Sequence, residues 1–532
     1  MADKDDELIK ENIKDSAMTR IAWKYDKNTV LNYARQSNYD ASDIELLFVL
    51  SNYLDWGISK KLDPSDLAEL FSEVTKIKNK LTFNNTPNIL FAMLRNIRTI
   101  RPYWLTIPFY KEILAPFGSQ VKENTGFNTD EIFDAIFKAV LASNPCKPPT
   151  TEEILNLDLW KEPEPLKMLW ERYSVNLSDL RTFGDIWDKS LINVDDNFRV
   201  ALTYKLPETI YKKMCRDLDR TYKKFGSSKG KALENAISNQ IKPFFQGSCI
   251  KWRVKLRKNN SKETDLVVEG KDFAFLIESK SAKFSGGSLD QSGLDAIRDA
   301  RKLINGVSQL SPFLKAFKDG NEELELSNRN IDVIRDHPLV LGAVITDDIY
   351  TTIAIDSVFN NDEAGEIEKN AKDTLQKYPV WIASIFDLKF LLLVSQTPSV
   401  LFHYIINFRS RRISDLMEEA DSWYVYADLL EDPDGLIMLG DRLMADDYFW
   451  TNKWWDLLKN GKERYAFPKW LVNSMDEIRS LDKEGRILDS MEVIDEKFQT
   501  AVKKFQQKYE KKIIFNKRND PNWSIWKIKK RN

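Results

Sequence analysis

The feature that most constrains the fold of this chain is the order of its β-strand patterns between residues 249 and 346. Three runs of strand-forming residues follow one another closely: CIKWRVKLRK (249–258), TDLVVEG (264–270) and FAFLIESKS (273–281). A long helical pattern comes next, and a fourth apolar run, LVLGAVIT (339–346), follows it. Apolar runs of this length, bounded by polar turn residues, are typical of strands. The sequence therefore predicts an α/β core.

A helix is predicted on each side of the first three strands. Upstream, GSSKG (226–230) is predicted to be a loop that precedes a helix. Downstream, apolar residues at helical spacing predict a long helix, which Pro312 is expected to kink or end. Residues 319–336 are expected to form a polar loop that can hold a short helix. The predicted order is helix, strand, strand, strand, helix, strand.

The rest of the chain is predicted to be mostly helical. With 532 residues, the protein is too long for one ordinary core, and two to four domains are expected. Residues 1–145 are predicted to form a helical N-terminal domain and residues 146–225 a helical connecting region. Residues 226–350 contain the predicted α/β core, and residues 351–532 are expected to be a mixed α/β C-terminal region.

The longest apolar stretch of the chain, residues 380–394, contains Asp387 and Lys389. It is too short and too charged to span a bilayer. We expect a strand there that continues into a helix at Ser384 or Asp387. The N-terminus is charged and has no apolar segment typical of a secretory signal. A cytoplasmic protein without a membrane partner is therefore expected.

Composition restricts the chemistry that is open to this chain. Three cysteines lie far apart and form no CxxC pair, which argues against a zinc site or a disulfide framework and favours a reducing compartment. The only histidines are His337 and His403, so a metal site built from several histidines is excluded. Carboxylates and lysines are the expected catalytic groups. The net charge is −2, so any binding of nucleic acid must depend on local basic patches.

Two carboxylates and a lysine stand near the ends of neighbouring strands. Asp265 begins one apolar strand, whereas Glu278 and Lys280 end the next. Alternate strand residues project from the same face, so Glu278 and Lys280 should point the same way and Ser279 the opposite way. A turn around residues 269–271 can pair the strands antiparallel and bring Asp265 alongside Glu278. Buried charges without partners are costly, and a divalent cation between the two carboxylates would remove that cost.

Residues 226–346 resemble the PD-(D/E)XK nuclease superfamily, which has the restriction-endonuclease-like fold. The matching stretches are GKALENAI (230–237), ETDLVV (263–268) and FLIESKS (275–281). The resemblance covers about a quarter of the chain. It implies an αβββαβ core with a central mixed sheet and hydrolysis of phosphodiester bonds with Mg²⁺ or Mn²⁺. Thr264 stands in place of the proline in the superfamily's name, a position that varies widely.

The resemblance also implies roles for individual residues. Asp265 and Glu278 resemble the metal-binding acids, and the carbonyl of Ser279 is a further candidate ligand. Lys280 resembles the lysine that positions or activates the attacking water and stabilises the transition state. Glu234 resembles a helix acid that supports the metal or its waters, or else it is an ordinary solvent-facing residue.

A polar stripe on the long helix contains Gln309, Arg298 and Lys302. In parts of the superfamily a glutamine on this helix reaches the active site, so Gln309 is a candidate catalytic residue. Arg298 and Lys302 are candidates for binding nucleic acid. The alternative for all three is a solvated helix face.

Four basic residues alternate along the first strand: Lys251, Arg253, Lys255 and Arg257. Repulsion among like charges on one face must be offset, either by a phosphate backbone or by acids of a neighbouring element. Basic residues at 408–412, and basic and aromatic residues at 503–531, are further candidates for contacts with nucleic acid.

These patterns together predict a metal-dependent endonuclease with DNA as the expected substrate. A large helical region beside such a core resembles the build of prokaryotic defence nucleases, which suggests antiviral defence. A homodimer or a partner protein bound through the helical regions is also expected. Two alternatives stay open: a catalytically inactive nucleic-acid-binding module on the same fold, and a helical scaffold that binds another protein.

Overall fold

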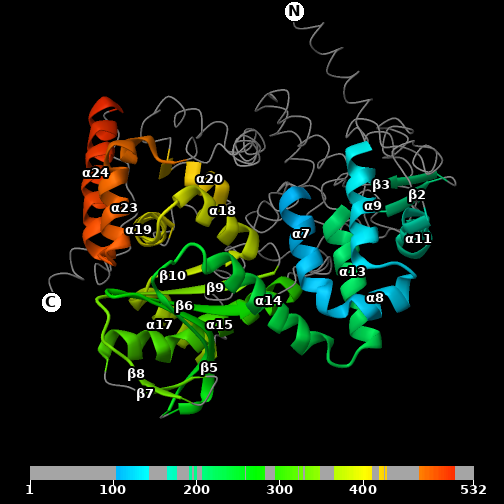
Figure 1. The fold of residues 1–532 in the computed structure, drawn as a ribbon, viewed down its shortest axis with the longest axis horizontal. Coiled ribbons are helices and arrows are strands. Elements are labelled where there is room, and N and C mark those ends of the chain that lie inside the picture. The colour runs from blue at the N-terminus through cyan, green and yellow to red at the C-terminus, as the bar shows by residue number, and fades with distance from the viewer. Residues whose placement is uncertain are drawn as a thin grey trace, which may run out of the picture. The chain divides into compact units, whose positions relative to one another are not determined.

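A computed structural model describes a large part of the chain, and Figure 1 shows it as a ribbon. It describes residues 103–142, 164–176, 191–194, 197–200, 206–257, 259–281, 294–320, 323–326, 330–347, 365–409, 419–424, 426–427 and 467–509. The helices predicted for residues 1–102, and the basic residues at 410–412 and 510–531, lie outside the described residues. The protein is a mixed α/β protein with many helices. It has two compact units, one mainly from residues up to Ala232 and the other mainly from Leu233 onward.

The first unit is mostly helical in its described part. Its helices are α7 (Tyr103–Leu114), η1 (Ala115–Phe117), α8 (Gly118–Thr125), α9 (Thr129–Ala142), α11 (Glu164–Tyr173) and α13 (Leu206–Thr221). Their apolar faces meet in a core where Tyr110 stacks on Tyr211 with ring centroids 4.3 Å apart. Burial of such faces stabilises helices that would be marginal in isolation.

A small sheet in this unit was not predicted. Its strands are β1 (Val175–Asn176), β2 (Leu191–Val194) and β3 (Asn197–Val200), in that order. The prediction of a helical connecting region over residues 146–225 is therefore wrong over these strands. Each strand has only two to four residues, which is too short for an alternating pattern to stand out in the sequence.

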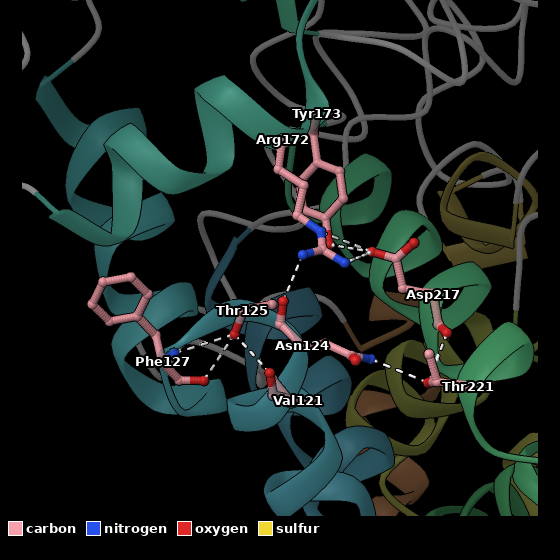
Figure 2. Close-up of polar contacts among 8 residues, drawn as sticks. All are labelled: Val121, Asn124, Thr125, Phe127, Arg172, Tyr173, Asp217 and Thr221. Atoms are coloured by element: carbon pink, nitrogen blue, oxygen red, sulfur yellow. Dashed lines mark hydrogen bonds and ion pairs between the residues drawn. The ribbon is translucent and has the colours of Figure 1, made fainter.

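A polar network joins α8, α11 and α13 (Figure 2). The Arg172 guanidinium donates to one oxygen of Asp217 at 2.9 and 3.1 Å and to the carbonyl of Asn124 at 2.5 Å. The Tyr173 hydroxyl donates to the same Asp217 oxygen at 3.0 Å. Burial and the neighbouring carboxylate raise the pKa of Tyr173 because both disfavour the phenolate. The Asn124 amide completes the network with a hydrogen bond to Thr221.

The second unit is built on a seven-stranded mixed sheet in the order β10-β9-β6-β5-β4-β7-β8. Its strands are β4 (Cys249–Leu256), β5 (Asn259–Glu269), β6 (Phe273–Lys280), β7 (Glu323–Glu325), β8 (Ile331–Val333), β9 (Leu339–Thr346) and β10 (Val380–Ser384). Strands β4, β5 and β6 pair antiparallel, whereas β6, β9 and β10 pair parallel. The four strands predicted between residues 249 and 346 are thus confirmed, but β5 begins at Asn259, so Asp265 lies inside this strand and not at its start.

Helices cover both faces of this sheet. On one face, α15 (Leu294–Asp319) and α17 (Glu366–Lys377) share a hydrophobic core with β4, β6 and β9 (Figure 1). On the other face, Phe273 and Phe275 of β6 contact Phe245 and Phe402, with ring centroids 5.1 to 6.0 Å apart. Because β6 is buried on both faces, its apolar run is nearly continuous.

Two helix boundaries around the core also differ from the prediction. Helix α14 (Phe225–Ile241) already begins at Phe225, so residues 226–230 are its first turns and not a loop. Glycine and serine are weak helix formers, but tertiary packing overrides that preference, since Phe225 is buried against Phe117. Helix α15 also continues through Pro312 to Asp319, where the sequence predicted a kink or an end.

The polar loop predicted for residues 319–336 is replaced in part by the antiparallel pair β7 and β8. Leu324 of β7 is fully buried and pairs with Leu256 of β4, which extends the sheet at this edge. A single buried leucine among charged neighbours was too weak a signal to predict a strand. Ile331 and Val333 of the outer strand β8 are exposed.

The C-terminal third contributes both to the sheet and to a helical layer. Strand β10 leads directly into α18 (Ile385–Ser395), and Ser384 caps this helix in a reciprocal capping box with Asp387. The predicted transition at this point is confirmed. The other described helices there are α19 (Pro398–His403), η5 (Tyr404–Phe408), α20 (Glu419–Tyr424), η9 (Lys469–Ser474), α23 (Met475–Lys483) and α24 (Ile487–Tyr509). None of the helices in the described ranges is long and apolar enough to cross a membrane.

Candidate active site

Strands β5 and β6 bring the two predicted metal-binding acids together. Their register pairs Leu266 with Ile277, which places Asp265 opposite Glu278, as the sequence predicted. One oxygen of Asp265 accepts hydrogen bonds from the backbone N–H and the hydroxyl of Ser279, each at 2.7 Å. Ser279, which was expected to point away from Glu278, therefore reaches Asp265 and fixes the orientation of its carboxylate.

Glu278 is a buried carboxylate with one unsatisfied oxygen. The residue is 3% exposed. Its Oε1 accepts a hydrogen bond from Lys280 Nζ at 2.6 Å, whereas its Oε2 is buried without a hydrogen-bond partner. Burial raises the pKa of Glu278 to about 8, and the nearby charge of Asp265 adds to this effect although Lys280 opposes it. A buried acceptor without a donor is costly, and a bound cation would satisfy it.

Lys280 is held between two elements. Its ammonium donates to Glu278 on its own strand and to Gln309 Oε1 on α15 at 2.5 Å. The contact with Glu278 agrees with the prediction that both side chains leave β6 on the same face. Gln309, for which a solvated helix face was the alternative, is thus brought to the site.

Gly306 allows this close approach of α15, and sequence reasoning missed it. A Cβ atom at Gly306 would lie 2.9 Å from Val344 Cγ1 and 3.3 Å from both Cγ and Cε of Lys280. The available signal was a glycine inside the predicted helix, between apolar residues of its buried face. The aliphatic stem of Lys280 packs where a larger residue would have its side chain.

Glu234 of α14 is half-buried and is not an ordinary solvent-facing residue. Its side chain is 13% exposed and forms an ion pair with Arg253, at 2.8 Å between Oε2 and Nη2. Burial raises the pKa of Glu234, while the hydrogen bonds from Arg253 lower it. The charge of Asp265 also raises this pKa, so the carboxylates of Glu234 and Asp265 lie close enough to repel each other.

The three basic residues of β4, and Arg257 directly after it, all have acidic partners. Their partners are Glu269 and Asp332 for Lys251, Glu234 for Arg253, Glu263 for Lys255 and Glu323 for Arg257. Acids of neighbouring elements therefore offset the repulsion along this strand, which is one of the two alternatives that the sequence left open. Contacts of these four residues with nucleic acid stay a prediction.

The remaining sequence candidates lie further along α15. Lys302 is exposed on this helix. Arg298 lies in its first turns, and its side chain falls outside the described residues. Both stay predictions as contacts to nucleic acid.

Neither histidine contributes to this constellation. His337 is buried, with Nε2 2.8 Å from Glu269 Oε1. His403 is buried in the C-terminal helical layer, with Nδ1 3.0 Å from the hydroxyl of Tyr426. The ionisable groups at the site are carboxylates, Lys280 and Arg253, and their part in catalysis stays a prediction.

The donor set fits a hard divalent cation. Asp265 and Glu278 offer oxygen atoms only, and the carbonyl of Ser279 lies between them and Lys280 in the chain. The described residues contain no cluster of three or more acidic, histidine or cysteine side chains that could hold a metal. Mg²⁺ commonly binds through one or two carboxylates and completes its shell with water and substrate phosphate, so two carboxylates suffice. The unsatisfied Oε2 of Glu278 is consistent with such a ligand.

The site combines two carboxylates on neighbouring strands, an anchored lysine and a third, arginine-paired acid. This arrangement can bind a cation and place a positive charge beside it. Comparison with family models, with curated proteins and with solved structures finds no match for the chain.

Proposed function

We propose that this protein is a metal-dependent nuclease of the PD-(D/E)XK type that hydrolyses phosphodiester bonds, with DNA as its substrate. The observation that carries the proposal is the convergence of Asp265, Glu278 and Lys280, with Glu278 Oε2 buried and unsatisfied. An unsatisfied buried acceptor on Glu278, beside a second carboxylate, supports a bound cation at this place. The order α14-β4-β5-β6-α15-β9, with the small β7–β8 pair inserted, also agrees with the predicted αβββαβ core.

Asp265 and Glu278 would hold the cation, together with the carbonyl of Ser279. The bound Mg²⁺ or Mn²⁺ supplies a Lewis acid for the phosphate and lowers the pKa of a bound water. Ser279 keeps the Asp265 carboxylate oriented through two hydrogen bonds, so little reorganisation is needed on binding. Preorganisation of this kind reduces the entropic cost of assembling the site.

Lys280 places a positive charge where negative charge builds on the phosphate during hydrolysis. The side-chain carbonyl of Gln309 accepts a hydrogen bond from the Lys280 ammonium and so restricts its position. Because this carbonyl is uncharged, it does not neutralise the charge of the lysine. Oε1 of Glu278 accepts a hydrogen bond from the same ammonium, which keeps the lysine in place until substrate binds. Lys280 can then hold or move a proton at the attacking water, because its position is fixed from two sides.

The proposal is tested by cleavage of supercoiled plasmid, linear duplex DNA, single-stranded DNA and RNA. Wild type and Glu278→Gln are compared with Mg²⁺, with Mn²⁺ and with EDTA. Glu496→Gln, which changes an exposed acid of α24, is the matched control. We expect cleavage by wild type and by the control, and its loss with EDTA or Glu278→Gln. Equal cleavage by wild type and Glu278→Gln, or cleavage that survives EDTA, would contradict the proposal.

The chain's wider role is part of the same proposal. Antiviral defence, a cytoplasmic location and assembly as a homodimer or with a partner protein are predictions from the sequence. Cutting both strands of a duplex with one site per chain requires a dimer or two successive nicks. The plasmid assay separates these routes, because a monomer accumulates nicked circles before linear product.

A further inference from the structure

Arg253 has an unusual backbone conformation in the middle of β4. Its φ is +46°, and it is one of only two non-glycine residues with positive φ in the part of the chain that the structure describes. The neighbouring pairs are Trp252 with Leu266 and Val254 with Thr264, so Arg253 lies opposite Asp265. A left-handed conformation is unfavourable for arginine and persists only where other contacts impose it.

The side chain of Arg253 is only partly used by its partner. Nε and Nη2 donate to the carboxylate of Glu234 at distances of 2.8 to 3.2 Å. Nη1 makes no hydrogen bond to any of the described residues, and the side chain is 37% exposed. A guanidinium has five N–H donors in a planar fork, so one edge can hold a carboxylate while the other binds an anion.

The charges around Arg253 explain why a cation is needed at this place. Glu234, Glu263 and Asp265 all act on its guanidinium. These acids would repel an approaching phosphate backbone. Lys280 is engaged by Glu278 and Gln309 and is less exposed than Arg253. Arg253 is therefore a partly exposed cation of β4 that lies beside these acids.

We propose that Arg253 is a positioning residue that links Glu234 to a phosphate of the substrate backbone. Its Nε and Nη2 edge fixes the Glu234 carboxylate, and its Nη1 edge binds a phosphodiester oxygen next to the cleaved bond. The positive φ at Arg253 sets the direction of its side chain within β4. This inference rests on the proposed nuclease function, because it assigns the contact to that substrate.

Binding of DNA in a background that cannot cleave tests the inference. The parent is Glu278→Gln, and the probe is a short fluorescein-labelled DNA, as duplex and as single strand. Arg253→Gly removes the guanidinium, and glycine suits a positive φ, so the fold should be kept. Arg253→Lys keeps the charge and loses the fork. Arg486→Gln, which removes an exposed cation between α23 and α24, is the control.

We expect Arg253→Gly to weaken binding roughly three- to tenfold and to reduce the slope of log affinity against log salt by about 1. Arg253→Lys and the control should keep the parent's slope. In the wild-type background, Arg253→Lys should lower kcat, since Glu234 loses its two-point partner. Glu234→Gln should lower kcat with no change in slope, because the cation is still present.

An unchanged salt slope in Arg253→Gly overturns the inference, even if cleavage falls, because the arginine then acts on Glu234 alone. Failure of the nuclease proposal looks different. In that case wild type does not cleave, or Glu278→Gln cleaves as well as wild type. If the parent binds no DNA while wild type still cleaves it, the inference about Arg253 falls and the nuclease proposal stands.

Discussion

Replacing Gly306 by alanine tests how closely the packing of α15 is coupled to the position of Lys280. The added methyl would approach Val344 Cγ1 to 2.9 Å and two carbons of the Lys280 stem to 3.3 Å, so at least one neighbour must move. Overpacking of this kind costs about 1–3 kcal/mol. The gain in helix propensity offsets about 1 kcal/mol of that cost. We therefore expect a net loss of about 0–2 kcal/mol in the free energy of unfolding.

The effect on cleavage should exceed the effect on stability. A shift of a few tenths of an ångström in the Lys280 stem changes the hydrogen bonds of its ammonium to Glu278 and Gln309. Displacements on this scale can lower kcat about tenfold. Chemical denaturation and steady-state cleavage of the same preparation measure the two effects separately.

A second glycine offers a matched control for this experiment. Gly230 is also inside a helix, α14, but a Cβ there would meet nothing within 4 Å. Gly230→Ala should stabilise the protein by up to about 1 kcal/mol and leave kcat unchanged. If Gly306→Ala cleaves as fast as wild type while Gly230→Ala behaves as expected, the packing of α15 does not control Lys280, and the reasoning is refuted.

Three further predictions concern polar contacts: those of Gln309 and Glu278 in the second unit, and those of Asp217 in the first. Gln309→Leu removes the second acceptor of Lys280, so kcat should fall about tenfold while DNA affinity changes little; an unchanged kcat would show that Glu278 alone positions the lysine. In the metal-free protein, the raised pKa of Glu278, from 4.5 to about 8, means that the folded state binds more protons than the unfolded state between these values. The free energy of unfolding should therefore fall by about a few kcal/mol as pH rises from 4.5 to 8. Urea denaturation of Glu278→Gln should not show this fall. Parallel pH profiles of wild type and Glu278→Gln would contradict the prediction. Asp217→Ala removes the acceptor that Arg172 and Tyr173 share, and should destabilise the first unit by about 1–3 kcal/mol in thermal denaturation. The salt dependence of DNA binding should not change. An unaltered melting temperature would show that water replaces the carboxylate.

The central strands and the pairing of Asp265 with Glu278 could be predicted because they depend on local patterns. Apolar runs bounded by turn residues define β6 and the second half of β5, and the short turn between them fixes the register. Once the register is fixed, strand periodicity determines which side chains share a face. The same logic identified β9 and the transition from β10 to α18.

The rest depended on tertiary contacts that local patterns do not encode. The start of α14 at Phe225 depends on burial against Phe117, although glycine and serine in the first turns disfavour a helix. The reach of Gln309 to Lys280 depends on how closely α15 packs on the sheet. The positive φ of Arg253 has no signal in the sequence, because that conformation is normally adopted by glycine or asparagine.

The parallel pairing of β10 with β9 has a practical consequence for anyone who shortens this protein. A fragment that ends near residue 350 would keep every candidate catalytic residue and yet lose the neighbour of β9. All eight residues of β9 are buried, and they carry no charge. Its unpaired backbone edge would then be a template for strand addition between molecules, which leads to aggregation. A fragment designed for enzyme assays should therefore include both β10 and α18, because the capping box of α18 is formed by Ser384, the last residue of β10.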